Sequence, residues 1–356
     1  HVFDSEIPNE EEPTHGRLRR VIEQLRTLYR PDDLGSIPGN PLALLALGEL
    51  QARALPGESY KLAFTPGLLS QTYARKAVRL IPDPASVLGG QAADRGGYLD
   101  LDGDGRWWIP SGRALLSPGD GDTADQELAH AREHFFLPHR YRDRFGQPTT
   151  VAYDSYDLLL AETRDPLGSL VTVGERLPDG TRDPSRRGHD YRVLQPRLVM
   201  DSNRNRSAVA SDALGMVVGT AVMGKPDERL GDSLDGFDVD LTDAAILEHV
   251  QNPLADPHAI LGRASTRLVY DPFAFYRTQS ETNPGAAVVY TLSRETHDAD
   301  LQPGHHSQVR HSFSFSDGFG RVMQNKAQAE PGPVPVRDGT GTMKIGADRQ
   351  PVVTDY

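Results

Sequence analysis

Four short segments after residue 140 share one pattern, in which Asp is followed by any residue, an apolar residue and Gly. The copies are Asp143–Gly146, Asp165–Gly168, Asp212–Gly215 and Asp317–Gly320. An Asp side chain accepts a hydrogen bond from the backbone two residues further on and so starts a tight turn. Gly adopts the left-handed conformation that other residues resist, and we expect the apolar residue to turn inward. The pattern therefore predicts tight turns between antiparallel strands, and it limits the chain to folds built from hairpins.

The turns recur at a short and regular interval. Degenerate copies start at Asp154 and Asp201, so Asp143, Asp154 and Asp165 are 11 residues apart, as are Asp201 and Asp212. A period this short is typical of a stacked or spiral β-sheet, in which each hairpin packs beside the previous one. The chain also has 34 Gly and 27 Pro among its 356 residues, which agrees with many turns that join short elements.

Alternating apolar residues, which are typical of β-strands, dominate the chain after Pro138. We expect strands at 149–153, 170–173, 216–222, 266–270 and 287–292, with one inserted helix near 241–250. Earlier in the chain, apolar spacing and capping residues predict helices at 18–28, 41–50, 66–78 and 123–136. The predicted fold is mainly β with an α-helical N-terminal part. Residues 1–139 form a helical and Gly/Asp-rich region, and residues 140–356 form a segment of stacked or spiral antiparallel sheet.

Composition excludes several classes of function. Asp and Glu number 50 against 38 Lys and Arg, which gives a net charge of −12 and argues against binding nucleic acid or an anionic membrane. The chain has no cysteine, so a disulfide framework or a cysteine-based zinc site is impossible. The first residues contain no signal peptide, and no stretch has the apolar length of a membrane helix. We interpret the chain, which lacks an initiator Met, as a piece of a longer protein.

Longer runs of sequence carry a family resemblance. The segment 315–324, around Asp317 and Gly320, resembles the Tyr-Asp repeats of Rhs-type proteins. Four further runs, at 58–69, 103–112, 134–146 and 205–220, resemble the middle region of the B component of bacterial insecticidal toxin complexes, a group that includes SpvB-like proteins. The resemblance extends over most of the chain, from about Leu25 to the end.

This resemblance implies a structural function. In that family the B component and a C component form a hollow cocoon of spiralling strands that encloses a toxic enzyme, and the B component docks on a pore-forming A component. The resemblance thus implies a secreted shell segment without catalysis of its own, whose partners are a C-type component carrying the effector and, through the rest of the full-length protein, the A component. It implies no contact with nucleic acid or membrane. The family's self-cleavage belongs to the C component, and no matching terminus is present here.

An enzymatic alternative depends on one short motif. His130, Glu133 and His134 have the spacing H-x-x-E-H of inverted zinc proteases, which on a helix places both imidazoles on one face with Glu as a general base. Such a site needs a third ligand, and Glu162 or Glu175 are the candidates that the sequence offers. Because no third ligand is assigned, we expect no stoichiometric transition metal and interpret the segment as a plain amphipathic helix.

A calcium site is the second metal hypothesis. Asp100, Asp102 and Asp104, followed by Gly105, have the spacing of the start of a calcium-binding loop. The twelfth position of such a loop is Ser111 instead of Glu, which excludes a complete EF-hand. We expect a structural Asp/Gly turn and no required cofactor, and any calcium site here is incomplete and weak.

Two further groups of residues, a set of histidines and a pair of tryptophans, suggest a ligand-binding function. His297, His305, His306 and His311 form a cluster in the sequence, which we assign to an exposed loop. The pair Trp107-Trp108 suggests a platform for sugars and hence a glycan-binding or cell-surface module, against the simpler expectation of aromatic packing inside a shell.

Overall fold

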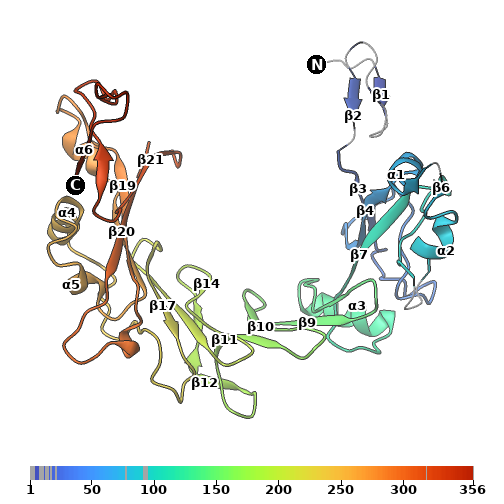
Figure 1. Cartoon of the computed structure of the whole chain (residues 1–356). Coiled ribbons are helices and arrows are strands. Elements are labelled where there is room, and N and C mark those ends of the chain that lie inside the picture. The colour runs from blue at the N-terminus through green and yellow to red at the C-terminus, as the bar shows by residue number, and fades with distance from the viewer. Residues whose placement is uncertain are drawn as a thin grey trace. The chain divides into compact units, whose positions relative to one another are not determined.

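A computed structural model describes residues 5–7, 12, 16, 18–20, 22–76, 78–90, 95–317 and 319–355 (Figure 1). The chain forms two compact units, His1–Val173 and Gly174–Tyr356. The sequence boundary near residue 139 falls inside the first of these units. Most regular structure is antiparallel β-sheet, as the turn pattern predicts. None of the helices in the described part of the chain has the length and apolar character needed to cross a bilayer.

The first unit contains a sheet in which neighbours along the chain pair with one another. Its strands follow in the order β3 (Leu25–Tyr29), β4 (Pro56–Phe64), β7 (Trp107–Leu115), β8 (Arg140–Arg142), β9 (Pro148–Tyr153), β10 (Leu160–Arg164) and β11 (Leu170–Arg176). All of these pairs are antiparallel. Two small ribbons lie outside this sheet: β1 (Ser5–Ile7) with β2 (Leu18–Arg20), and β5 (Ala74–Arg75) with β6 (Val78–Arg79).

Two of the four helices expected in this unit form. The helix α1 (Pro66–Thr72) is capped by Thr65, and α3 (Ala124–Glu133) begins with a capping box in which Thr123 and Gln126 bond each other's backbone. A short helix α2 (Pro84–Leu88) was not expected. The first two expected helices are corrections: the chain over 18–28 forms β2 and most of β3, and the chain over 41–50 consists of turns and irregular backbone. Val21 lies outside the described residues.

Strand pairing explains these corrections. The residues of β3 pair one by one with those of β4, from Leu25 opposite Lys61 onward, so their backbone bonds are satisfied across the sheet and not along a helix. The apolar stripe is not buried as a unit, since Ile22 and Leu25 are exposed. In the next segment Gly48 has a φ of 88°, which no helix accommodates.

Two apolar clusters hold the first unit together. One joins α3 to the loops beside the sheet and consists of Leu34, Leu55, Leu116, Leu128 and Ala131. The other lies under α1 and α2 and consists of Leu69, Leu88 and Trp107. A buried ion pair borders the first cluster: Arg30 donates to both carboxylate oxygens of Glu127 at 2.7 Å, and Glu127 also accepts from the backbone of Leu116.

The second unit repeats the same organisation. Its strands follow in the order β15 (Leu198–Met200), β16 (Arg206–Ser211), β17 (Val217–Met223), β18 (Thr266–Asp271), β19 (Ala287–Arg294), β20 (Val309–Ser316) and β21 (Val322–Ala327), all antiparallel. The strand β12 (Arg182–Arg187) pairs with the end of β11. Two small ribbons complete the unit: β13 (His189–Asp190) with β14 (Gln195–Pro196), and β22 (Pro333–Pro335) with β23 (Val353–Asp355). Strands form at all five ranges that the sequence predicts.

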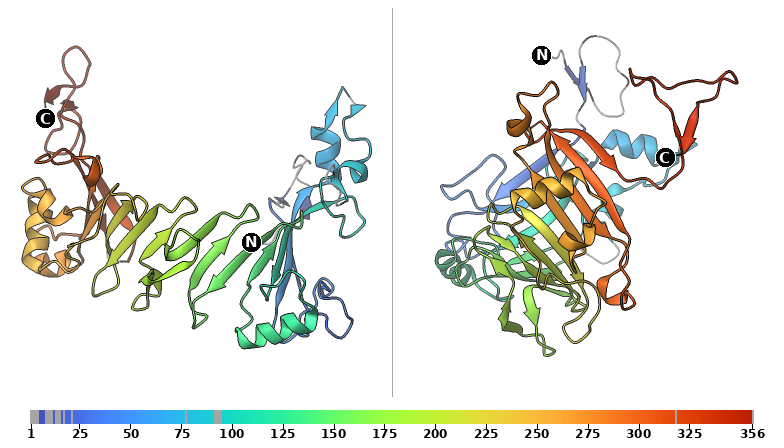
Figure 2. Two further views of the ribbon diagram at one scale, coloured as in Figure 1. Left: turned by 90° about the horizontal axis from the view of Figure 1, so that it is seen from below. Right: turned by 90° about the vertical axis from the view of Figure 1, so that its left-hand side faces the viewer.

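Helices cover one side of the later strands in this unit (Figure 2). The expected inserted helix is present as α4 (Asp243–Gln251), capped by Thr242. Two short helices, α5 (Pro257–Leu261) and α6 (Ala274–Thr278), and a 3₁₀ turn over Asp298–Asp300 add to it. The helices bury an apolar cluster against the sheet, with Leu261, Ala264, Val269, Tyr290 and Leu292 at its centre.

Candidate functional site: repeated turns, a charged cleft and a histidine cluster

The four Asp-to-Gly turns have one geometry. Gly146, Gly168, Gly215 and Gly320 have φ values of 82°, 86°, 83° and 82°. In each case the preceding strand ends one residue before the Asp and the following strand begins two residues after the Gly. The positive φ and the position between paired antiparallel strands are those that the pattern predicts. The four turns connect β8 with β9, β10 with β11, β16 with β17, and β20 with β21. Gly318 lies outside the described residues.

The Asp side chain fixes each turn in the same way. Oδ1 of Asp143 accepts from the backbone N–H groups of Phe145 and Gln147, both at 2.8 Å. The other three carboxylates accept from the same relative positions, two and four residues on: Asp165 from Leu167 and Ser169, Asp212 from Leu214 and Met216, and Asp317 from Phe319 and Arg321. One carboxylate therefore satisfies two backbone donors that the ladder leaves free at the hairpin end.

The apolar residue of the pattern does not turn inward as expected. Leu167 and Phe319 are 92% and 88% exposed, and Phe145 and Leu214 are also exposed. The reason is geometric: the turn is satisfied by its own Asp and Gly, so the side chain between them projects beyond the end of the ladder. The apolar residue is consequently not a requirement of the turn.

Two related turns were missed or only partly recognised, one at Asp338 with both bonds and one at Asp201 with the bond from the residue four positions on. Asp338 accepts from Thr340 and Thr342, and Gly341 has a φ of 86°, so this is a fifth copy without an apolar third residue. In the degenerate copy at Asp201, Arg204 has a φ of 71° in place of Gly. A search for Asp-x-x-Gly alone finds the former, whereas nothing in the sequence marks Arg204.

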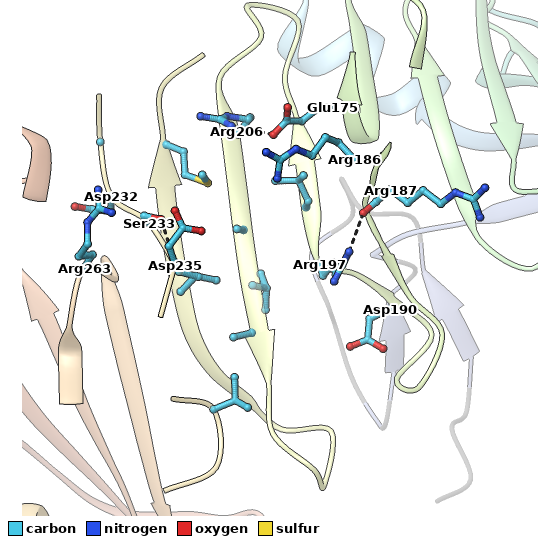
Figure 3. Close-up of a pocket in the computed structure, with 18 of the residues that line it drawn as sticks. Glu175, Arg186, Arg187, Asp190, Arg197, Arg206, Asp232, Ser233, Asp235 and Arg263 are labelled. Atoms are coloured by element: carbon cyan, nitrogen blue, oxygen red, sulfur yellow. Dashed lines mark hydrogen bonds and ion pairs between the residues drawn. The ribbon is translucent and has the colours of Figure 1, made fainter. Parts of the chain in front are cut away.

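A charged cleft of about 860 Å³ lies within the second unit (Figure 3). Both arginines and carboxylates line it, and three of the carboxylates have arginine partners. Arg206 Nη1 lies 2.8 Å from Glu175 Oε1, and Arg192 Nη2 lies 2.9 Å from Asp190 Oδ2. The hydrogen bond from Arg192 lowers the pKa of Asp190 below its ordinary value. The cleft therefore contains both ion pairs and arginines, such as Arg186 and Arg187, for which the described residues show no carboxylate partner.

Asp232 is the fully buried carboxylate of this cleft. Its oxygens accept from the backbone of Asp298 at 2.8 Å, from the hydroxyl of Ser265, and contact His297 Nδ1 at 2.9 Å. Arg294 Nε lies 3.5 Å away and supplies the compensating positive charge. The contacts of Asp232 link β19 and the 3₁₀ turn to the loop that follows β17, so they stabilise the fold of this unit.

The helix α3 places His130 and His134 on one face, as the H-x-x-E-H spacing predicts, and a third histidine joins them. His130 Nδ1 lies 2.9 Å from the carbonyl oxygen of Leu116, and His134 Nδ1 lies 2.9 Å from Asp157 Oδ2. His139, just before β8, completes the group, in which one ring nitrogen from each histidine lies within 4.8 Å of the others. Burial and the two neighbouring histidines lower the pKa of His139, which favours its neutral form.

The residues that the sequence offered as the rest of a hydrolase site lie elsewhere. The side chain of Glu133 is exposed. Glu162 forms an ion pair with Arg164, and Glu175 pairs with Arg206. Sequence reasoning missed His139 because it lies six residues beyond the end of α3 and belongs to no spacing motif.

The three aspartates of the calcium hypothesis form a tight turn. Asp100 accepts from the backbone of Asp104 and Gly105, both at 3.1 Å. Asp102 pairs with Arg26 at 2.7 Å, and Asp104 accepts from the backbone of Arg106 at 3.0 Å. Each carboxylate is thus engaged with the protein itself.

The geometry does not support the two remaining binding hypotheses, the sugar platform at Trp107-Trp108 and the cluster of four histidines. Trp107 and Trp108 are 8% and 0% exposed, and the guanidinium of Arg26 covers the Trp108 ring at 4.1 Å, so neither ring face is available as a sugar platform. Three of the four clustered histidines have separate partners: His297 contacts Asp232, His311 contacts Tyr290, and His306 lies against His258. The assignment to an exposed loop is wrong for His311, which is buried in β20 because its ring packs against Tyr290. His305 is exposed.

Comparison with solved structures identifies the architecture. No protein-family model matches the chain, and no curated protein matches it by sequence. Three structures match over 94% of this chain: TcdB2-TccC3 (TM-score 0.53, 20% identity), TcdB2-TccC3-Cdc42 (TM-score 0.54, 18% identity) and the Photorhabdus luminescens Tc holotoxin pore (TM-score 0.52, 17% identity). The fold resembles that of Tc toxin components. The chain spans only 13%, 16% and 15% of the length of the three matched chains, so the likeness to Tc components concerns one segment of them.

Proposed function

We propose that this chain is a wall segment of a secreted toxin-complex component, and that it helps to enclose a toxic effector for delivery. The observation that carries the proposal is the likeness to Tc components over 94% of the chain, together with hairpins that repeat with one turn geometry. Successive antiparallel hairpins extend a sheet strand by strand, which suits a continuous wall.

The proposed partners follow from the matched structures. TcdB2-TccC3 and the Tc holotoxin are assemblies of several components, so we propose a C-type component that carries the effector as the direct partner. The A component would be reached through the rest of the full-length protein. We further propose that the segment is secreted within the complex and has no catalysis of its own; the pairing of Glu175 with Arg206 and of Asp190 with Arg192 in the cleft is in line with this.

Imaging of the assembled complex tests the proposal. The full-length protein is produced together with its C-type component, and the particle is imaged by electron microscopy. We expect a hollow particle whose wall accommodates this segment, with the effector protected from added protease until the shell is unfolded. A solid particle, or an effector that is cut as fast as the free effector, would refute the shell function.

Mutation of a turn links the shell function to this segment. Gly215→Val should speed cleavage of the enclosed effector, because the new side chain meets both a positive φ and Val193. Gly121→Ala is the control, since Gly121 lacks a positive φ and has open space around it. Equal cleavage rates in the two variants would show that the turn does not support the wall.

A further inference from the structure

His130, His134 and His139 come together from two neighbouring elements. His130 and His134 lie one helical turn apart at the end of α3, and their rings stack with centroids 4.2 Å apart. His139 approaches from the start of β8, with its ring at 87° to His130 and 74° to His134. The chain returns to the helix through Phe135 and Phe136, whose φ values are 54° and 57°. Two successive residues in this conformation form a sharp reversal, which brings His139 back against the face that it would otherwise leave.

Hydrogen bonds assign the tautomers of the first two histidines. A carbonyl oxygen only accepts, so the contact between His130 Nδ1 and the Leu116 oxygen requires the proton on Nδ1. The carboxylate of Asp157 imposes the same tautomer on His134. In both neutral rings Nε2 then carries a free lone pair. A metal-binding histidine typically donates its other ring N–H to a carbonyl or a carboxylate in this way.

The third histidine has an unsatisfied nitrogen. His139 is 8% exposed, and its Nε2 has no hydrogen-bond partner among the described residues. A buried polar atom without a partner is unfavourable, and such an atom in a native structure points to a bound water or ion. Nε2 of His139 is therefore the group that a ligand between the three rings would satisfy.

We propose that His130, His134 and His139 bind one zinc ion, with a water or a partner's side chain as the fourth ligand. Imidazole nitrogens suit zinc, and three of them leave one position of a tetrahedral site open. Nitrogens around a tetrahedral zinc lie about 3.3 Å apart, given Zn–N distances of about 2.0–2.1 Å. One ring nitrogen of each histidine lies within 4.8 Å of the others, so side-chain rotations that shorten this spacing would close the site.

The proposed site is structural. Glu133 is exposed and does not belong to the group of three donors found among the described residues, so the motif does not supply a base beside them. The ion would instead link the end of α3 to the start of β8, two elements whose connection is only six residues long. The expectation that the chain carries no stoichiometric metal depended on the lack of a third ligand, and His139 supplies it.

Metal analysis of the full chain, purified without a tag, tests the proposal. We expect about one zinc per chain by elemental analysis, and a tetrahedral d–d absorption band when cobalt(II) replaces zinc. His139→Ala should lower zinc affinity at least about 100-fold, and Asp157→Asn should lower it about 10- to 100-fold, because Asp157 only orients His134. The exposed His305→Ala is the matched control and should leave affinity unchanged.

Thermal unfolding provides the second readout. Zinc should raise the melting temperature of the wild-type chain and of His305→Ala, and raise that of His139→Ala much less, because an ion that binds only the folded state stabilises it. If His139→Ala fails to fold, Asp157→Asn and His130→Gln take its place in the comparison. Absence of cobalt binding, or equal zinc affinity in wild type and the histidine variants, would overturn the site.

Discussion

The glycines that close the four turns differ in what surrounds them. A Cβ on Gly146 would meet nothing within 4 Å, whereas one on Gly215 would lie 2.9 Å from Cγ1 of Val193. We expect Gly146→Ala to lower the free energy of unfolding by about 1–2 kcal/mol, the cost of a left-handed residue. Gly215→Ala should cost more, because the neighbouring side chain must also move. Urea unfolding measures both.

Gly121→Ala is again the control, here for the free-energy cost of placing a residue with a side chain in the left-handed backbone conformation. Gly121 has open space and no positive φ, so its replacement should change stability by less than about 0.5 kcal/mol. Equal effects at Gly121 and Gly146 would mean that the conformation of the turn is not what makes glycine necessary there.

His311 and His258 make the folded chain sensitive to acid. Burial lowers the pKa of His311, and burial together with His306 lowers that of His258. The unfolded state therefore binds more protons below its pKa of about 6.5, so stability should fall as pH decreases from about 7.5 to about 5.5. Each group contributes at most about 1.4 kcal/mol per pH unit. Urea unfolding in the presence of a chelator measures this slope without any effect of metal.

His311→Phe isolates one of these groups. Phenylalanine fills the site and cannot titrate, and the hydroxyl of Tyr290 keeps its bond to the carbonyl of Pro253. The variant should show a shallower decrease of stability between pH 7.5 and 5.5. A slope identical to that of the wild type would assign the acid sensitivity to other groups.

Among the elements, α3 depends on its buried carboxylate. Glu127 receives two hydrogen bonds from Arg30 and one from the backbone of Leu116, and both side chains of the ion pair are buried. Glu127→Gln leaves Arg30 without a compensating charge, so we expect a loss of about 3–5 kcal/mol in the free energy of unfolding. The exposed pair of Glu23 and Lys61 is the control, and Glu23→Gln should cost less than about 1 kcal/mol. Similar losses in both variants would contradict this account.

The loop between 100 and 105 tests the calcium hypothesis. Calcium would have to displace the Arg26 partner of Asp102 and the backbone bonds of Asp100. We therefore expect the melting temperature to stay the same with and without millimolar calcium. A rise that disappears in Asp100→Asn would establish a weak site instead.

Elements whose conformation is determined by neighbouring residues could be predicted from the sequence, whereas elements determined by distant residues could not. The turns, α1, α3 and α4 are determined by residues within one turn of each element, such as Thr65, Thr123 and Thr242 at the helix caps. The segment 18–28 also has helical apolar spacing, but its conformation is decided by pairing with β4, which begins at Pro56. Because the pairing strand is so distant in sequence, the residues of the segment itself do not indicate the pairing.

At the scale of the whole chain, the β class could be predicted because the turn pattern repeats. The resemblance in sequence and the structural likeness to Tc components both concern this repeating sheet. The candidate metal site could be predicted only in part. His130 and His134 are linked by helical spacing, whereas His139 meets them through a reversal at Phe135 and Phe136, residues with no turn preference of their own.

The carboxylate that fixes each of the four turns bonds only within its own turn: each Asp reaches no further than four residues along the chain. A turn whose closing bonds are all local carries its own conformation with it, so a hairpin of this kind is a unit that can be copied within a sheet. Under the proposed shell function, the size of the enclosed space would depend on how many copies the gene encodes, and copying a hairpin would be a route to a larger one.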